Sequence, residues 1–165
     1  MKVEIQMQGL DGVLESLRTL PPEVVSKNGG PVKTALRTGA RLIAYEAKKN
    51  LRVAVSNTDD ESKKYSTGLL MENVVVRRGK KPTGSNGEKV LVSIKNKRYE
   101  RKGKEVTTRK TASLLEYGSS KQPAEPWLRP AFNSKAQEAI STIESDLKKR
   151  IEKIVAKLAA QNVGK

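Results

Sequence analysis

Alternation of apolar and polar residues predicts three short strands. Residues 2–8 alternate with the period of two that marks a half-buried strand. Residues 73–78 are rich in valine, and residues 89–95 alternate again, so both segments are predicted to be strands. Residues 80–88, which connect them, contain one proline and two glycines and are predicted to form a turn or a long hairpin tip.

Apolar residues at spacings of three and four predict two long helices. The first begins at Pro31, a residue that suits the first turn because that turn does not need its N–H, and runs for about twenty residues. Its apolar stripe consists of Val32, Leu36, Ala40, Ile43, Ala47 and Leu51. The second helix begins after Arg129 and is about thirty residues, or about 45 Å, long. Its apolar stripe consists of Ala136, Ile140, Ile143, Leu147, Ile151, Ile154 and Leu158.

The environment of the two long helices follows from the same pattern. Polar positions of the first helix are basic and are expected to face water; they are Lys33, Arg37, Arg41 and Lys48. The second helix repeats like a heptad over about three repeats, so it either forms a coiled coil or lies across the strands. The need to cover the strands favours the second arrangement.

Shorter segments complete the expected organisation. A helix is predicted at residues 11–20, where Asp11 suits the N-cap, and another at residues 111–117, which Gly118 ends. Residues 52–66 are expected to form a loop. A length of 165 residues suits one domain, so residues 1–165 are treated as a single domain.

Composition restricts the chemistry that this chain can perform. It contains no cysteine and no histidine, which excludes disulfides, thiolate or histidine zinc sites, and nucleophiles activated by histidine. Residues 59–61 are acidic, but their polar surroundings favour a solvated loop over a metal site. Residues 84–87 lack the lysine and the strand–helix context of a phosphate-binding loop. The chain is therefore not predicted to be an enzyme, to bind a cofactor or a small-molecule substrate, or to span a membrane.

The apolar content is low for a self-sufficient core. Hydrophobic residues make up 36% of the chain and aromatic residues 4%, so the core is expected to consist mainly of Leu, Ile, Val and Ala. Such a core is thin for a monomer of this length, so either the core is small or a partner covers part of the apolar surface.

The positive charge is the second strong feature of the composition. The formal net charge is +15, from 33 basic and 18 acidic residues, and such an excess attracts polyanions. Two runs hold the candidate contact residues: Arg77, Arg78, Lys80 and Lys81 in the first, and Lys95, Lys97, Arg98, Arg101, Lys102 and Lys104 in the second. Solvated loops, contacts with DNA in a channel and contacts with acidic patches on neighbouring proteins all remain open for these runs. Hairpin tips that extend outward favour a protein interface.

Residues 115–132 differ from the rest of the chain. A helix end with a glycine stop leads into a polar loop with three prolines in eight positions, which should fix the path of the loop. Trp127 and Phe132, the only Trp and the only Phe, are expected to anchor the end of this loop in the core. Glu116 is placed to cap backbone N–H groups or to pair with Arg129. None of these features indicates catalysis.

This segment resembles the hallmark of the lambdoid-phage gene-product-ten family of morphogenesis proteins. Family members carry an acidic–aromatic–Gly–Thr/Ser turn and then Pro-Ala-x-Pro-aromatic-Leu-Arg-Pro-Ala, and residues 116–119 and 123–131 match both in order. The matching residues include Glu116, Tyr117, Gly118, Pro123, Pro126, Trp127, Leu128, Arg129 and Pro130. Residues 67–70 resemble the Thr-Gly-x-Leu step of the family, and residues 9–14 resemble its Gly-Leu-Asp start.

The resemblance implies a place in the neck of a tailed phage, between the head connector and the tail tube. It implies a homo-oligomeric ring, commonly sixfold, around the path of the genome, with the connector or stopper and the tail terminator or tube as neighbours. Such a protein is assembled in the host cytoplasm and belongs to the virion. The implied fold is α+β, with a small antiparallel sheet packed by long helices and a long C-terminal helix. The main alternative, which rests on charge alone, is a basic nucleic-acid-binding protein without sequence preference; a prophage regulator or enzyme is a further one.

Overall fold

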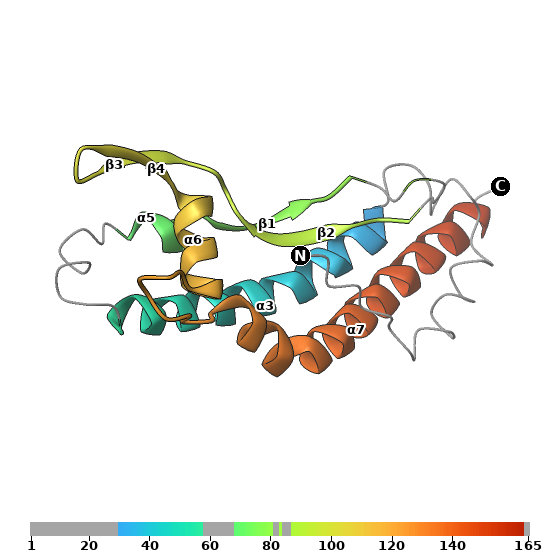
Figure 1. The fold of residues 1–165 in the computed structure, drawn as a ribbon. Helices are drawn as coiled ribbons and strands as arrows, with labels where there is room; N and C mark the ends of the chain where they lie inside the picture. The colour runs from blue at the N-terminus through green and yellow to red at the C-terminus, as the bar shows by residue number, and fades with distance from the viewer. Residues whose placement is uncertain (1–29, 58–67, 81–82, 84–86, 164–165) are drawn as a thin grey trace.

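The computed structural model describes residues 30–57, 68–80, 83 and 87–163 (Figure 1). Its elements are α3 (Gly30–Ser56), α5 (Leu69–Glu72), β1 (Val74–Arg78), β2 (Val90–Ile94), β3 (Arg98–Arg101), β4 (Lys104–Thr107), α6 (Thr108–Tyr117) and α7 (Leu128–Val163). The fold is α+β, as expected, with two antiparallel sheets of two strands each and a long C-terminal helix. The strand expected at residues 2–8, the helix expected at 11–20 and the acidic residues 59–61 lie outside the described residues.

Helices α3 and α7 form the principal packing contact of the molecule, and they run antiparallel. Near one end, Asn50 of α3 donates a hydrogen bond to the carbonyl of Trp127 at 3.2 Å, and further along Thr38 lies 3.5 Å from Asp146. The strands pack on another side of α3, so α3 lies between them and α7 (Figure 1). The prediction that α7 lies across the strands is therefore wrong: α3 covers the strands, and α7 covers α3.

This middle position explains why the buried face of α3 differs from the predicted stripe. The buried residues are Ala35, Gly39, Ala44, Ala47, Leu51 and Ala54, whereas Val32, Leu36, Ala40 and Ile43 are only half-buried. Small side chains allow the helices to approach closely: a Cβ on Gly39 would lie 2.5 Å from Cγ1 of Ile143 and 2.8 Å from the carbonyl oxygen of Ala139. A stripe of hydrophobic residues in the sequence emphasises large side chains. It does not identify positions such as Gly39, where the close approach of two helices requires a small residue.

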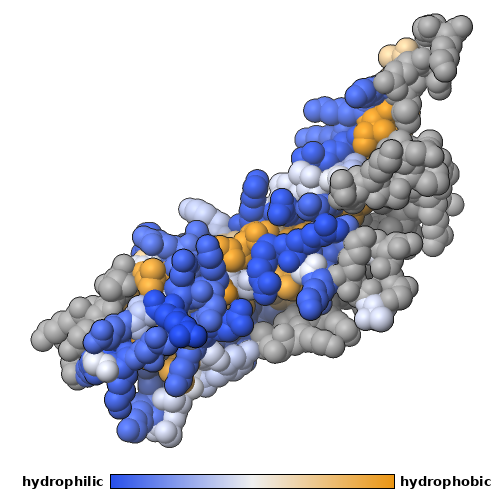
Figure 2. Space-filling model, turned by 90° about the horizontal axis from the view of Figure 1, so that it is seen from above, coloured by the Kyte–Doolittle hydropathy of each residue, from blue (hydrophilic) through white to orange (hydrophobic). Residues whose placement is uncertain are grey.

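The two hairpins have different relations to the core. In the first, Val74 pairs with Ile94 and Val76 with Val92, and all four pack into the core that α3 and α6 complete. These two strands were predicted. In the second, β3 pairs with β4 where an extended tip was expected, and Lys102 and Gly103 form its turn with positive φ angles of 51° and 68°. Seen from the strand side, the surface shows a hydrophobic band bordered by hydrophilic groups (Figure 2).

Three predicted boundaries move. Helix α3 continues to Ser56, so the prediction of a loop is wrong for residues 52–56, because Ala54 still packs into the core. Helix α6 begins at Thr108, with Thr107 as its N-cap. Helix α7 begins at Leu128 and not after Arg129, because Pro130 in the first turn costs no intrahelical hydrogen bond.

The core of the described chain is small in volume. Seven of its fourteen buried apolar residues are alanines, and the larger ones are Leu51, Val74, Ile94, Leu115, Trp127, Leu147 and Ile151. Leu147 and Ile151 belong to the predicted stripe of α7, while Ile140, Ile143 and Ile154 are half-buried. Among the described residues, none of the helices is both long and apolar enough to cross a membrane.

Candidate functional site

Helix α6 is fixed at its start by threonines. Thr107 accepts a hydrogen bond from the N–H of Lys110 at 3.3 Å, which caps the helix. Thr108 is almost fully buried; its hydroxyl donates to the carbonyl of Lys95 at 2.7 Å and accepts from the N–H of Lys97 at 2.9 Å. These bonds join α6 to the end of β2 and the start of β3. The position of Glu116, in the last turn of α6, is set by this attachment.

The Glu116 carboxylate lies at the N-terminus of α7 and accepts four hydrogen bonds. Oε2 accepts from the backbone N–H groups of Trp127 at 2.9 Å and Leu128 at 2.8 Å. Oε1 accepts from the backbone N–H of Arg129 at 3.1 Å and from its Nε at 2.9 Å. The N–H groups at a helix start have no partner within the helix and carry partial positive charge, which a carboxylate satisfies. Glu116 thus makes both contacts that the sequence suggested, the backbone cap and the pair with Arg129.

The environment of Glu116 keeps it ionised. Its side chain is only 5% exposed, and this burial acts to raise its pKa. The hydrogen bonds from the N–H groups of Leu128 and Trp127, together with those from Arg129, outweigh burial and hold the pKa of Glu116 below its ordinary value. A charged carboxylate therefore faces the start of α7 at neutral pH.

Arg129 and Trp127 complete the contact between α6 and α7. Arg129 donates a second side-chain hydrogen bond to the carbonyl of Glu116 at 3.1 Å, and its guanidinium lies 5.2 Å from the ring centre of Tyr117. Trp127 is 2% exposed, and its indole N–H donates to the carbonyl of Ala112 at 3.2 Å. Phe132 is only half-buried, so Trp127 anchors the segment more deeply than Phe132 does.

Gly118 sets the path of the loop between the two helices. Its φ of 74° and ψ of −174° fall in a region that essentially only glycine adopts, and an added Cβ would lie 2.8 Å from the backbone nitrogen of Ala124. The N–H of Glu125 donates to the carbonyl of Leu115 at 2.8 Å, which brings the loop back along α6. We call Glu116, Gly118, Trp127 and Arg129 the Glu116 clamp, because together they join α6 to α7.

Several candidate contact residues in the hairpins already have partners. Arg78 forms a two-pronged ion pair with Glu88, at 2.9 and 2.6 Å, and the Glu88 side chain is only 5% exposed. Nε of Arg77 donates to the Ser93 hydroxyl at 2.8 Å. These arginines stabilise the β1–β2 hairpin, so they must exchange a partner before they can bind anything else.

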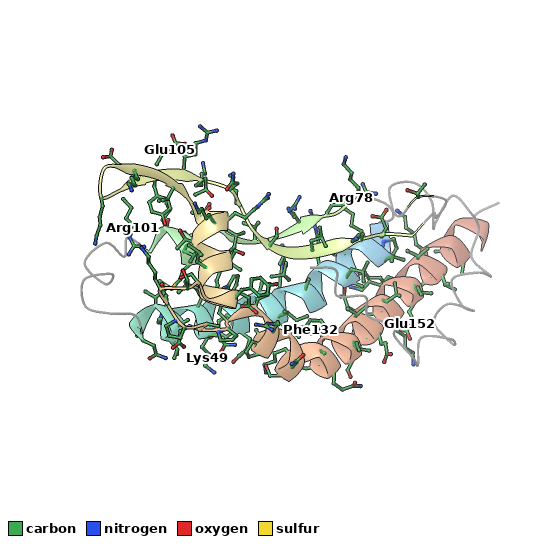
Figure 3. The ribbon with its side chains drawn as sticks, in the orientation of Figure 1. Lys49, Arg78, Arg101, Glu105, Phe132 and Glu152 are labelled. Atoms are coloured by element: carbon green, nitrogen blue, oxygen red, sulfur yellow. The ribbon has the colours of Figure 1, made fainter. Side chains whose placement is uncertain are left out.

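The second basic run is more open to solvent. Arg98 pairs with Glu105 at 3.2 Å, but both side chains are well exposed, so this pair contributes little to stability. The exposed lysines of the two runs are Lys80, Lys95, Lys97, Lys102 and Lys104. Arg101 is half-buried, and Lys81 lies outside the described residues. Figure 3 shows Arg101 and Glu105 on the β3–β4 hairpin and Arg78 far along the strand side of the molecule, so the two runs do not form one site.

Three structural contributors were not identified from the sequence. They are Thr108, Glu88 and Asn73, which is buried and donates from its side chain to the carbonyl of Leu69 at 2.7 Å. Two adjacent threonines, Thr107 and Thr108, precede the segment predicted as a helix. Because threonine is a common N-cap, they could have indicated that the helix begins near Thr108. Sequence carries no comparable signal for Glu88, because its partner Arg78 lies ten residues away across a hairpin.

The contacts described at the Glu116 clamp join α6 to the start of α7. Within the described ranges, no cluster of three or more Asp, Glu, His or Cys residues could hold a metal ion. Comparison of the chain with protein-family models, with curated proteins and with solved structures finds no match. Function is therefore inferred from the clamp, the charge distribution and the motif itself.

Proposed function

We propose that this chain is a non-catalytic structural subunit of the head–tail junction of a tailed phage, which assembles as a ring between the head connector and the tail tube. The Glu116 clamp is the observation that carries the proposal. The motif residues that resemble the phage family are the residues that join α6 to the start of α7. All four hydrogen bonds of the Glu116 carboxylate come from Trp127 and from the first two residues of α7, which supports a structural role for the motif.

A fixed joint suits a ring subunit. Closed rings require that every copy presents its two contacting surfaces at the same angle. The clamp sets the direction of the long helix α7 relative to α6 and the strands, so surfaces on these elements keep a constant relation. A flexible joint would distribute the subunits over several angles and would hinder closure.

Apolar side chains on the surface provide candidate contacts between copies. Val53 is 57% exposed, Tyr117 51%, Val155 48% and Leu114 41%. Tyr117 and Leu114 lie beside the clamp on α6, and Val155 lies on α7. With so many alanines in the described core, this exposed apolar surface supports a subunit that is stabilised further by assembly.

The direct test is the mass of the assembly. We expect the purified chain to form a closed ring, alone or after mixing with its head connector, with a single stoichiometry in native mass spectrometry. Leu114→Ser, on the surface beside the clamp, should weaken the ring and leave the fold intact, whereas Ser113→Ala, its exposed neighbour, serves as the matched control. A chain that stays monomeric at high concentration and with the connector present would contradict the proposal.

A basic nucleic-acid-binding protein is the second candidate function. The net charge of +15 favours it, because such an excess attracts polyanions. A chain with this function alone would bind duplex DNA without forming a ring. Mass measurement and a DNA-binding assay on the same preparation therefore separate the two candidates.

A further inference from the structure

The outer face of α3 carries a continuous row of cations that the hairpin predictions did not include. Five residues at spacings of four, four, three and four share one face of the helix. They are Arg37, Arg41, Tyr45, Lys48 and Arg52. All five are exposed. At about 1.5 Å per residue the row is about 22 Å long. We call these five residues the α3 row.

The charges of the α3 row are not neutralised within the described part of the chain. The side chains of its three arginines and its lysine form no ion pair or hydrogen bond with another described residue. Glu46 is the only acidic residue of α3, and it is half-buried and pairs with Lys49 at 3.5 Å. The row is thus a line of positive charge without an acidic residue in it.

The other charged surfaces of the molecule are different. In the hairpins, Arg78 and Arg98 pair with glutamates. Helix α7 mixes both signs along its length, and its pairs are Lys135 with Glu138 and Arg150 with Asp146. A paired cation must lose its partner before it can bind a new anion, whereas an unpaired exposed cation loses only its counterions. No cation of the α3 row therefore has to lose a partner within the described chain before it binds a polyanion.

We infer that the α3 row binds the phosphate backbone of duplex DNA without sequence preference. Arg, Lys and Tyr are among the side chains that donate hydrogen bonds to phosphate oxygens, and the row contains only these three types. Four cations in two pairs, one on each side of Tyr45 along a single helix face, suit a regular line of anions. An acidic protein surface presents its carboxylates irregularly and pairs better with interfaces that also contain apolar groups. Tyr45, at the centre of the row, supplies a hydroxyl donor between two pairs of cations.

The α3 row consists of residues of α3 alone and includes no residue of either hairpin. The binding itself does not depend on the proposed ring. That α3 faces the channel of a ring follows only if the proposed function also holds.

The experiment compares three variants of the full chain that each lose four positive charges. The α3 variant carries Arg37→Gln, Arg41→Gln, Lys48→Gln and Arg52→Gln. The α7 control carries Lys148→Gln, Lys149→Gln, Lys153→Gln and Lys157→Gln, all at exposed positions. The hairpin variant carries Arg98→Gln, Arg101→Gln, Lys102→Gln and Lys104→Gln. Fluorescence anisotropy with a labelled duplex of random sequence, across about 50 to 200 mM salt, measures the affinity of each.

The inference predicts a change in salt dependence and not only in affinity. Four lost phosphate contacts should reduce the slope of log K against log salt by about three to four, so wild type should lose roughly 100-fold more affinity over this salt range than the α3 variant. The α7 control and the hairpin variant should keep most of the wild-type slope. A charge-conserving variant, Arg37→Lys, Arg41→Lys and Arg52→Lys, should also keep it, which shows that an effect of the Gln substitutions is not due to misfolding.

Three results would overturn the inference. One is an α7 control that lowers the slope as much as the α3 variant, because binding would then follow net charge alone. Another is a hairpin variant with the larger effect. The third is a wild type that does not bind the duplex; if it instead binds poly-L-glutamate through the same four residues, the surface is a site for an acidic protein. None of these results bears on whether the chain forms a ring, so the proposed function is tested separately.

Discussion

The two ends of helix α6 show opposite uses of charge. At its C-terminal end, Glu116 and Arg129 form an ion pair at 2.9 Å. The Glu116 side chain is 5% exposed, and its carboxylate accepts four hydrogen bonds. At its N-terminal end, the β3–β4 hairpin contains Arg98 and Glu105 at 3.2 Å, with side chains 76% and 65% exposed. Both pairs involve an arginine and a glutamate, and the sequence alone does not distinguish them.

Burial gives these two pairs different roles. When a buried carboxylate loses its hydrogen-bond donors, the folded state is destabilised, because water does not replace them. The same holds for buried donors that lose their acceptor. An exposed pair exchanges its partner for water at almost no cost. The Glu116 clamp therefore determines structure, and the hairpin retains charges that are available to a partner. Substitutions at the two ends should separate stability from assembly.

The largest effect on stability is expected from Trp127→Ala. Trp127 is 2% exposed and lies in the main core cluster, so its removal should lower the free energy of unfolding by about 3–5 kcal/mol. Chemical denaturation followed by circular dichroism measures this loss. Phe132→Ala, at a half-buried position four residues into α7, is the matched control and should cost less. A Trp127→Ala protein as stable as wild type would show that the indole is not part of the core in solution.

Glu116→Gln should have the next largest effect, and the effect should depend on pH. Gln keeps the size but loses the charge and one acceptor oxygen, so N–H groups at the start of α7 lose a charged acceptor, at a cost of about 2–3 kcal/mol at neutral pH. Because the pKa of Glu116 is lowered in the folded state, its stabilisation is complete above the unfolded pKa of about 4.3 and is lost as pH falls through the folded value.

Denaturation of wild type and of Glu116→Gln at a series of pH values tests this statement. The difference between the two proteins should be constant above about pH 5 and should shrink below about pH 4, where wild type itself becomes protonated. Glu100→Gln, at an exposed position of β3, should show no comparable difference at any of these pH values. A difference that persists unchanged in acid would mean that the charge of Glu116 is not what stabilises the clamp.

Gly118→Ala tests the loop independently of charge. Alanine at this position is strained by the positive φ and meets the backbone nitrogen of Ala124 at 2.8 Å, so we expect a loss of about 1–3 kcal/mol. Gly103→Ala is the matched control, because φ is also positive there but nothing lies within 4 Å of the added Cβ. Equal losses for the two variants would mean that strain alone, and not the close approach of residue 124, requires glycine at position 118.

Local patterns in the sequence predict much of the fold. Valine content predicted β1, alternation predicted β2, and spacings of three and four predicted α3 and α7. Gly118 marked the end of α6, and the prolines marked the loop that follows it. Glu116 was predicted to cap backbone N–H groups or to pair with Arg129 because it lies just before a turn of small residues. These inferences depend on residues near one another in the chain.

Predictions that required distant residues were less successful. The order of layers depends on Gly39 and Ala35, whose small size allows α7 to approach α3, and hydrophobicity gives such residues little weight. The α3 row was noted only as a water-facing side, since its lack of acidic partners appears only when the rest of the molecule is in place. The roles of Glu88 and Thr108 likewise depend on partners across a hairpin and a strand end.

The smallest effect on stability, and the clearest test of the comparison, is expected from the hairpin. The variant that carries Arg98→Gln, Arg101→Gln, Lys102→Gln and Lys104→Gln should change the free energy of unfolding by less than about 1 kcal/mol, because the ion pair between Arg98 and Glu105 on this hairpin is well exposed. A larger loss in chemical denaturation would show that the hairpin charges stabilise the fold as those of the clamp do, and the contrast between the two ends of α6 would fail.

The same hairpin variant separates the two partners considered for these residues. If the hairpin contacts acidic patches on neighbouring proteins, the folded variant should fail to join heads to tails, with slower association at low salt. If it contacts DNA in the channel, joining should proceed and retention or passage of DNA should be disturbed. Because the α3 row offers a separate, unpaired surface for phosphate, we expect loss of joining from the hairpin variant and loss of DNA binding from the α3 variant. A hairpin variant that joins normally but releases its DNA would reverse this assignment.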